Sequence, residues 1–415
     1  MRCVAVALLY AIAAFAQKAV TVDQLPAAVT RFDDSAIHAP LPCTIDPIKP
    51  MLNFGLRFQT GYVLHTSLDP YREGKHAWYI VFDVIPEGGG RPVYFLDSID
   101  IPPGAAAGQI AEATGTFLLG EGHYGVKWSL LDDLGRVCRA KWSVDAQLAG
   151  NEKAAKISMP PGTVGDFSWH PAEVAAPPAG EHARHITVLM NAAMPVGRQS
   201  GRRMQSSAGA ISQWGTLVSI LGSMLEHLPG VSVRLVVFNQ DQQREIFRQE
   251  GFTAGQMSQV AHAADGIEQW KVDSHVLLNP AGGWNLLSDL EDKEIHAAIP
   301  SDTVVFLGLP EASGEKMPPG MPEGGAEHSP RFVYLRYGKN VPIATGTGLN
   351  PRGRGAAQGP SATRGRGGGG SLAPDLSSEM VESDPIEQSV RRMKGKTITI
   401  STPAALGKAI ESIQR

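Results

Sequence analysis

A proline-rich stretch divides this chain of 415 residues into two segments with different hydrophobic patterns. Residues 149–183 include Pro160-Pro161-Gly162 and Pro177-Pro178. Proline lacks the backbone N–H donor, so this stretch sustains neither a helix interior nor a central strand. We therefore interpret residues 149–183 as a linker between two domains.

The segment before the linker has the pattern of an all-β domain. Residues 50–148 contain about seven short apolar or alternating runs, which is the number expected for an immunoglobulin-like sandwich. Glycine- and proline-rich turns, such as the one at residues 86–90, separate these runs. The pattern predicts a β-sandwich over residues 50–148, with residues 17–49 as an N-terminal extension.

Strand and helix patterns alternate after the linker, over residues 184–415. Residues 186–190, 231–238, 303–309, 331–337 and 397–401 have the apolar character of buried strands. Helical periodicity appears at residues 206–228, 286–298 and 403–413 between or after them. Because such alternation is typical of parallel sheets with helical crossovers, it predicts a doubly wound, Rossmann-like α/β domain. The complete fold-class prediction is a multidomain chain with an all-β sandwich first and this α/β domain second.

The α/β segment also contains a stretch that cannot form a core. Residues 346–384 are dominated by Gly, Pro, Arg, Ser and Ala, and they include two short Arg-Gly repeats. Such a composition buries too little apolar area to offset the cost of ordering the chain. We predict a disordered insertion here that acts as a flexible tether.

The first residues predict export from the cytoplasm. Arg2 precedes a short apolar core, and Ala14-Phe15-Ala16 is a small-x-small cleavage site. We therefore expect residues 1–16 to be a signal peptide and the mature protein to be periplasmic or extracellular. No later segment has the roughly 18 apolar residues that a membrane-spanning helix needs, so no transmembrane segment is expected in the mature chain.

Cleavage would leave two cysteines, Cys43 and Cys138. In an oxidising compartment this pair predicts a disulfide. The alternative is two ordinary buried thiols, because free cysteine is among the most buried residue types. Two cysteines without CxxC spacing do not suggest a zinc site.

The overall charge gives no sign of nucleic-acid binding. The net charge is −4, without the basic excess that nucleic-acid-binding domains carry. The chain also has no HExxH motif, no paired carboxylates and no Gly-x-Ser-x-Gly nucleophile elbow. These absences favour a protein that is not an enzyme and has no cofactor.

The order of landmarks after the linker resembles a von Willebrand factor A-like (vWA) domain of bacterial exported type. The resemblance rests on the first apolar strand, on Gly282-Gly283-Trp284 and on the strand that ends at Leu309. In that family, aspartate and hydroxyl side chains at the ends of these strands form a metal-ion-dependent adhesion site. Here Asn191, Ala193, Pro195, Trp284 and Leu309 occupy the matching places. None of them supplies a carboxylate or hydroxyl, so the resemblance implies a metal-independent vWA-like domain.

The resemblance also implies that the same edge of the sheet binds a partner protein. The candidate residues of this partner-binding edge are Asn191, Pro195, Arg198, Arg202, Trp284 and Leu309. An exposed Trp284 would be an apolar anchor, and the alternative is that Trp284 fills the vacated metal site. The arginines have the alternative interpretation of a solvated loop.

Three functions are compatible with these observations. The leading hypothesis is an exported, non-enzymatic protein-interaction module. The second is an envelope-associated hydrolase with its site between the two domains, which requires a nucleophile, a base and an orienting group to converge there. The third is a purely structural spacer.

Overall fold

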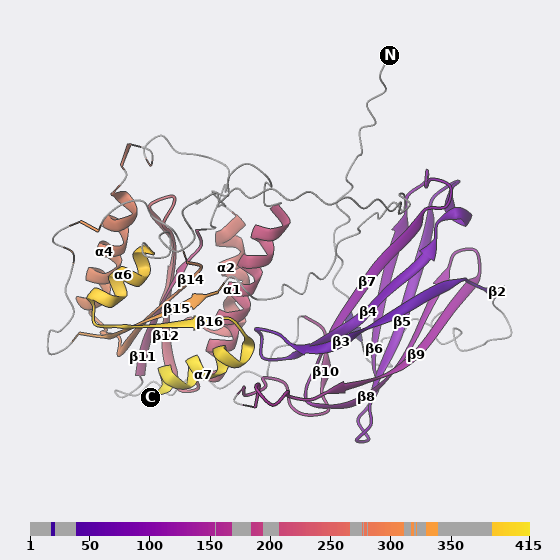
Figure 1. Cartoon of the computed structure of the whole chain (residues 1–415), viewed down its shortest axis with the longest axis horizontal. Coiled ribbons are helices and arrows are strands. Elements are labelled where there is room, and N and C mark those ends of the chain that lie inside the picture. The colour runs from indigo at the N-terminus through magenta and orange to yellow at the C-terminus, as the bar shows by residue number, and fades with distance from the viewer. Residues whose placement is uncertain are drawn as a thin grey trace, which may run out of the picture.

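The chain forms two parts that lie side by side in the computed structural model (Figure 1). The structure describes residues 18–20, 39–153, 155–167, 184–193, 207–265, 276, 278–279, 281–310, 317–318, 321, 329–338 and 384–415. The predicted signal peptide and nearly all of the predicted insertion lie outside these residues. Among the described residues, no helix is both long and apolar enough to cross a membrane.

The N-terminal part is built from two sheets. The larger sheet has the strand order β1-β6-β5-β8-β9-β2, and the smaller has the order β10-β7-β4-β3. Most neighbouring strands are antiparallel, whereas β2 pairs with β9 in parallel. The strands are β1 (Lys18–Val20), β2 (Ala39–Pro40), β3 (Cys43–Leu52), β4 (Phe58–Ser67), β5 (His76–Pro86), β6 (Val93–Ile101), β7 (Ile110–Leu119), β8 (Gly122–Asp132), β9 (Arg136–Ala146) and β10 (Val164–Gly165).

Alternating apolar residues place one face of each sheet in a shared aromatic core. On β5, Trp78 and Phe82 are each 1% exposed, whereas Tyr79 between them is 46% exposed. This is the period of two that a strand imposes. Tyr62 of β4 packs edge-on against Phe82 and Trp128, with ring centroids 5.6 and 5.2 Å apart. Aromatic contacts of this kind join the two sheets.

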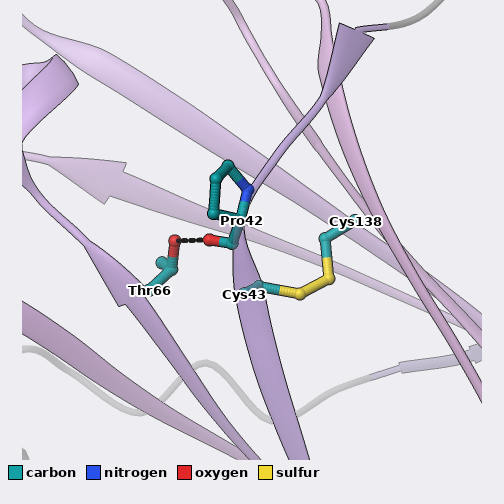
Figure 2. The surroundings of a disulfide bond; sticks show 4 residues. All are labelled: Pro42, Cys43, Thr66 and Cys138. Atoms are coloured by element: carbon teal, nitrogen blue, oxygen red, sulfur yellow. Dashed lines mark hydrogen bonds between the residues drawn. A yellow bond between two sulfur atoms is a disulfide. The ribbon is translucent and has the colours of Figure 1, made fainter.

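A disulfide also joins the two sheets, as the sequence predicted. It links Cys43 of β3 to Cys138 of β9, whose Cα atoms are 6.2 Å apart and whose positions are separated by 95 residues (Figure 2). Beside it, the Thr66 hydroxyl donates a hydrogen bond of 2.8 Å to the Pro42 carbonyl. Closing so long a loop stabilises a fold by about 2–4 kcal/mol.

The C-terminal part contains a six-stranded sheet of order β13-β12-β11-β14-β15-β16. Its strands are β11 (Arg184–Asn191), β12 (Val231–Asn239), β13 (Arg244–Gln249), β14 (Thr303–Gly308), β15 (Arg331–Tyr337) and β16 (Lys396–Ile400). All neighbouring pairs are parallel except β12 and β13, which are antiparallel.

Helices cover both faces of this sheet (Figure 1). Side chains of α1 (Ser207–His227), α2 (Met257–Asp265) and α7 (Pro403–Gln414) share one core with the sheet, and α4 (Gly282–Ile295) and α6 (Pro385–Arg392) share another. Alternation along β11 explains the two cores, because Val188 belongs to the first and Leu189 to the second. Pro at the start of α6 and α7 suits the first helical turn, where the missing N–H has no intrahelical partner.

The two parts meet at the tight turn between β3 and β4, residues 53–57. Phe54 of this turn packs edge-on against Tyr337 of β15, with ring centroids 5.4 Å apart. Ser223 of α1 donates a hydrogen bond of 2.7 Å to the Phe54 carbonyl. Arg57 forms an ion pair with Glu226 of α1, and both side chains are at most 10% exposed. Residues 53–57, which we call the plug, therefore attach the N-terminal part to α1 and β15 of the C-terminal part.

The predicted fold class is wrong. Strands make up 44% and helices 24% of the part of the chain that the structure describes, so this part is mostly β and has few helices. It does not divide into an all-β domain and a helix-rich, doubly wound vWA-type domain. The first and third sheets each mix parallel and antiparallel pairs, because β2 and β13 add to their edges with the minority orientation. Edge strands this short or this polar carry too weak a pattern to reveal their orientation in the sequence.

Strands also occur in the two segments that the sequence analysis placed outside the domains. Residues 17–49, which were expected to be an extension, contribute β1, β2 and most of β3. Residues 149–183, which were expected to be a linker, contribute β10 at Val164–Gly165. Prolines within β3, at positions 47 and 50, are compatible with its place at the edge of the smaller sheet.

Candidate functional site

Parallel pairing gathers the ends of β11, β12 and β14 at one edge of the third sheet, which we call the C-terminal edge. Asn191 ends β11 and lies opposite Phe238 of β12. Gly308 ends β14, and a Cβ atom built on it would lie 3.1 Å from Asn191 Cβ. The sequence placed its candidate partner-binding residues at this edge. Of these, the structure describes Asn191, Trp284 and Leu309, whereas Pro195, Arg198 and Arg202 lie outside the described residues.

Asn191 holds the local backbone together. Its side chain is buried, and the residue is 1% exposed. The Oδ1 atom accepts hydrogen bonds from the backbone N–H groups of Ala193, at 3.0 Å, and Gln240, at 3.3 Å. Both lone pairs of this oxygen are therefore used to join the end of β11 to the end of β12.

The other two described candidates are also buried. Trp284 is 2% and Leu309 is 4% exposed. Trp284 packs with Leu189, Phe238 and Phe306 in the core beneath α4. An exposed tryptophan anchor is therefore not present, and the ring instead fills the interior at this edge. This difference arises because helix α4 begins at Gly282 and turns Trp284 toward the sheet.

Amide side chains form a brace above this core. Gln243 Nε2 donates a hydrogen bond of 2.8 Å to the Asn279 carbonyl, and Asn279 Nδ2 donates one of 3.2 Å to Gln243 Oε1. This brace ties the turn between β12 and β13 to the start of α4. A Cβ atom on Gly282 would lie 1.8 Å from Gln243 Oε1, so glycine leaves the space that the brace needs.

A buried carboxyl group lies near the same edge, and the sequence analysis did not identify it. Asp384 caps helix α6, since its Oδ1 accepts a hydrogen bond of 3.1 Å from the Ile386 N–H. Tyr334 donates to both Asp384 Oδ2, at 3.2 Å, and the Leu309 carbonyl, at 3.1 Å. Burial raises the pKa of Asp384 to about 6. The Asp-Pro pair at positions 384 and 385 was a detectable N-cap signal.

An exposed leucine is the other feature that sequence reasoning missed at this edge. Leu278 is 82% exposed, which is the largest value among the large hydrophobic residues of the described chain. It directly precedes Asn279, which forms two hydrogen bonds with Gln243. Nothing in the local sequence distinguishes this leucine from the buried ones, because its exposure depends on tertiary packing.

The opposite end of the sheet carries a buried charge network. Glu294 of α4 accepts hydrogen bonds from Arg234 at 2.5 Å, Arg248 at 2.7 Å and Thr187 at 2.8 Å. The carboxylate is fully buried and has both oxygens paired with cations. Such a satisfied network fixes α4 against β11 and β12 rather than binding a ligand.

Among the described residues, no group of three or more His, Cys, Asp or Glu side chains could hold a metal ion.

The seam between the two parts is filled by residues of the 53–57 turn, with Phe54 8% and Leu56 0% exposed. Histidines of the N-terminal part instead contact carboxylates of their own sheets. One example is His76 Nδ1, which lies 3.0 Å from Asp133 Oδ2.

The comparisons with known proteins give matches among solved structures alone. No protein-family model and no curated protein sequence matches it. The putative ApaA protein from Bordetella pertussis is 9% identical, with a TM-score of 0.19, and the match covers 27% of this chain and 99% of that one. Superoxide reductase (neelaredoxin) from Ignicoccus hospitalis is 18% identical, with a TM-score of 0.18, and the match covers 28% of this chain and 91% of that one.

A lipoprotein from Bacteroides thetaiotaomicron is 14% identical, with a TM-score of 0.16, and the match covers 29% of this chain and 92% of that one. Likenesses this slight carry no argument about function. The class that the fold defines is therefore a mostly β protein of two joined parts. Its candidate site is an amide-braced edge with one exposed leucine.

Proposed function

We propose that this protein is an exported, non-enzymatic interaction module that binds a partner protein at the C-terminal edge without a metal ion. The observation that carries the proposal is the exposed Leu278, held by the brace between Gln243 and Asn279. Protein interfaces commonly have an apolar centre surrounded by a polar rim. Two polar residues, Asp241 and Gln242, directly precede Gln243 in the turn after β12.

Independence of metal is supported by the state of the edge residues. Asn191 Oδ1 already accepts two backbone hydrogen bonds, and Trp284 and Leu309 occupy buried positions. A hard cation needs several oxygen ligands to offset its dehydration. Export is supported by the disulfide between Cys43 and Cys138, because such bonds persist in oxidising compartments.

Metal independence is tested by calorimetric titration of the chelator-treated mature protein with Mg²⁺, Ca²⁺ and Mn²⁺. We expect no binding heat and no change in melting temperature, since a ligand of the native state must raise its stability. Saturable binding that Asn191→Ala abolishes would show that the edge holds a metal after all.

Partner binding is tested with a photo-crosslinking amino acid at Leu278 in the producing cell. The matched control carries the same amino acid at Ile299, which is 49% exposed near the opposite end of the sheet. We expect a discrete adduct from position 278 alone, unchanged by chelator. The partner identified in this way should then bind the purified protein, and Leu278→Ser should weaken the affinity about tenfold or more. Equal adducts from both positions, or none from either, would favour a structural spacer.

A further inference from the structure

Strand β16 forms an edge of the third sheet. It stands last in the strand order, and among the described strands it pairs with β15 alone. The Gly338 N–H donates a hydrogen bond of 3.0 Å to the Ile400 carbonyl, so Ile400 directs its backbone toward β15. Because backbone groups alternate in direction along a strand, Thr397 and Thr399 direct their N–H and C=O groups away from β15. These are the groups with which an added strand would pair.

Other edge strands of the described chain carry features that discourage such pairing. Strand β3 contains Pro47 and Pro50 and has a bulge in its pairing with β4. Strand β13 has a bulge in its pairing with β12, and β1 and β2 are only three and two residues long. Prolines, bulges and short length commonly protect the edges of sheets. By contrast, β16 has no proline, its pairing with β15 is continuous, and its last four residues are all β-branched.

Positive charge is concentrated where β16 begins. Four of the residues at positions 391–396 are basic, namely Arg391, Arg392, Lys394 and Lys396. Lys394 and Lys396 are exposed, and neither forms an ion pair within the part of the chain that the structure describes. Arg391 lies 3.4 Å from a Glu387 oxygen, but the same carboxylate also pairs with Arg336. The start of the edge strand therefore keeps an excess of positive charge.

A tight junction between α6 and β16 fixes these charges beside the edge. Lys394 adopts a φ of 56°, and its N–H donates a hydrogen bond of 3.0 Å to the Arg391 carbonyl. The Gly395 N–H donates one of 2.8 Å to the Val390 carbonyl, which closes the end of the helix. A Cβ atom on Gly395 would lie 2.5 Å from the Phe332 carbonyl oxygen, so the junction runs directly against β15. The lysines on either side of Gly395 therefore extend from an anchored backbone.

This charge selects the kind of chain that fits the edge. A second copy that paired through its own β16 would bring two basic groups onto one edge, where like charges repel each other. An extended acidic segment meets both requirements of the edge, since its backbone can pair with the strand and its carboxylates can contact the lysines. Strand addition of this kind obtains its affinity from main-chain hydrogen bonds and its specificity from side chains.

We propose that β16 binds an extended, acidic segment of another protein, which adds to the third sheet beside β16. The segment pairs with the outward backbone groups of Thr397 and Thr399, and its carboxylates contact Lys394 and Lys396. This surface involves none of the residues of the proposed partner-binding edge, so the inference does not depend on the proposed function.

The test is the fluorescence anisotropy of labelled peptides mixed with the purified full chain. The probe is a peptide of alternating glutamate and valine that is long enough to span β16, and the control peptide has lysine in place of glutamate. We expect saturable binding of the glutamate peptide and a dissociation constant about tenfold higher or more for the lysine peptide. A glutamate peptide that is methylated on every backbone nitrogen keeps its charges but has no N–H donors, and it should not bind.

Substitutions in the protein test the two contacts separately. K394E with K396E should weaken binding of the glutamate peptide about tenfold or more, whereas K75E with K141E, at exposed lysines of the N-terminal part, should not change it. Thr397→Pro removes an outward N–H and should also weaken binding, and Thr397→Val, which keeps that N–H, should not. The methylated peptide makes the same test if Thr397→Pro does not fold.

Three results would overturn the proposal. Equal binding of the methylated and unmethylated peptides would show that charge alone attracts them, without strand addition. Absence of any binding by the glutamate peptide would show that the edge does not accept an acidic strand. A dimer of the natural chain in sedimentation that Thr397→Pro dissociates would assign the edge to a second copy.

Discussion

Two buried glutamates of helix α4 differ in the partners of their carboxyl groups. Glu291 of α4 is fully buried and accepts a hydrogen bond from the Ser389 hydroxyl of α6. Glu294, one turn further along the same helix, is equally buried but is paired with Arg234 and Arg248. Ionisation therefore costs more free energy at Glu291 than at Glu294, although the sequence does not distinguish the two residues.

The Glu291→Gln variant should be more stable than the natural chain at alkaline pH. Burial raises the pKa of Glu291 to about 7, from an ordinary value of 4.5. The folded state therefore holds this proton more tightly than the unfolded state, and stability falls as pH rises from about 4.5 to about 7. Removing the charge should recover up to about 3 kcal/mol at pH 8 and little at pH 4.5. Urea unfolding at both pH values measures this difference.

The matched control is Glu294→Gln, which leaves Arg234 and Arg248 without their shared carboxylate. This variant should be destabilised at pH 8, because removing one partner leaves buried cations uncompensated. Equal effects of the two substitutions at pH 8 would contradict the distinction between Glu291, which accepts a hydrogen bond from Ser389, and Glu294, which is paired with two arginines.

Strands β4 and β7 pack so closely at one glycine that no larger residue fits. Strands β4 and β7 pair over ten residues, with Gly61 opposite Thr116. A Cβ atom on Gly61 would lie 1.9 Å from the Gly115 carbonyl oxygen, which belongs to the backbone. Gly125 of β8 has nothing within 4 Å of the same position. The two glycines thus provide a matched pair within one sandwich.

The Gly61→Ala variant should be destabilised because β4 and β7 must separate to admit a methyl group. Overpacking of this kind costs about 1–3 kcal/mol. The Gly125→Ala variant should stay within about 0.5 kcal/mol of the natural chain. Denaturant unfolding measures both. A loss in Gly125→Ala as large as that in Gly61→Ala would show that the strands tolerate the contact and that loss of glycine alone matters.

At the scale of the whole molecule, the plug formed by residues 53–57 couples the two parts. Leu56 of the plug adopts a φ of 51° and is fully buried. A non-glycine residue in this left-handed region is strained, and the surrounding contacts hold it there. Ser158 Oγ supports the turn by donating a hydrogen bond of 3.1 Å to the Gly55 carbonyl.

The intact protein should therefore unfold in a single calorimetric transition, and Phe54→Ala should separate it into two. The substitution removes the ring that packs on Tyr337, and a buried Phe-to-Ala change costs about 3–5 kcal/mol. Phe167→Ala, at a residue that is 46% exposed, is the control and should preserve the single transition. Two transitions in the unmodified protein would show that the seam does not couple the parts.

Local patterns determined the positions of the strongly periodic elements. The helix predicted at residues 206–228 is α1 (Ser207–His227), and the strands predicted at 303–309 and 331–337 are β14 (Thr303–Gly308) and β15 (Arg331–Tyr337). Cysteine count and the expected compartment also predicted the Cys43–Cys138 bond. The positions of these helices and strands depend on side chains that are near one another in sequence. The disulfide was predictable because cleavage of the signal peptide would leave one pair of cysteines.

Tertiary structure decided the fold class, the orientation of edge strands and the exposure of side chains at the candidate site. The short strand β2 is parallel and β13 is antiparallel because of the neighbours they meet, and their sequences carry no sign of either. Trp284 is buried because α4 packs one face against the sheet, whereas Leu278, which precedes this helix, is exposed. A one-dimensional pattern records how often apolar residues recur. It cannot record which distant segment covers them, because the free energy of burial depends on contacts made only after the chain has folded.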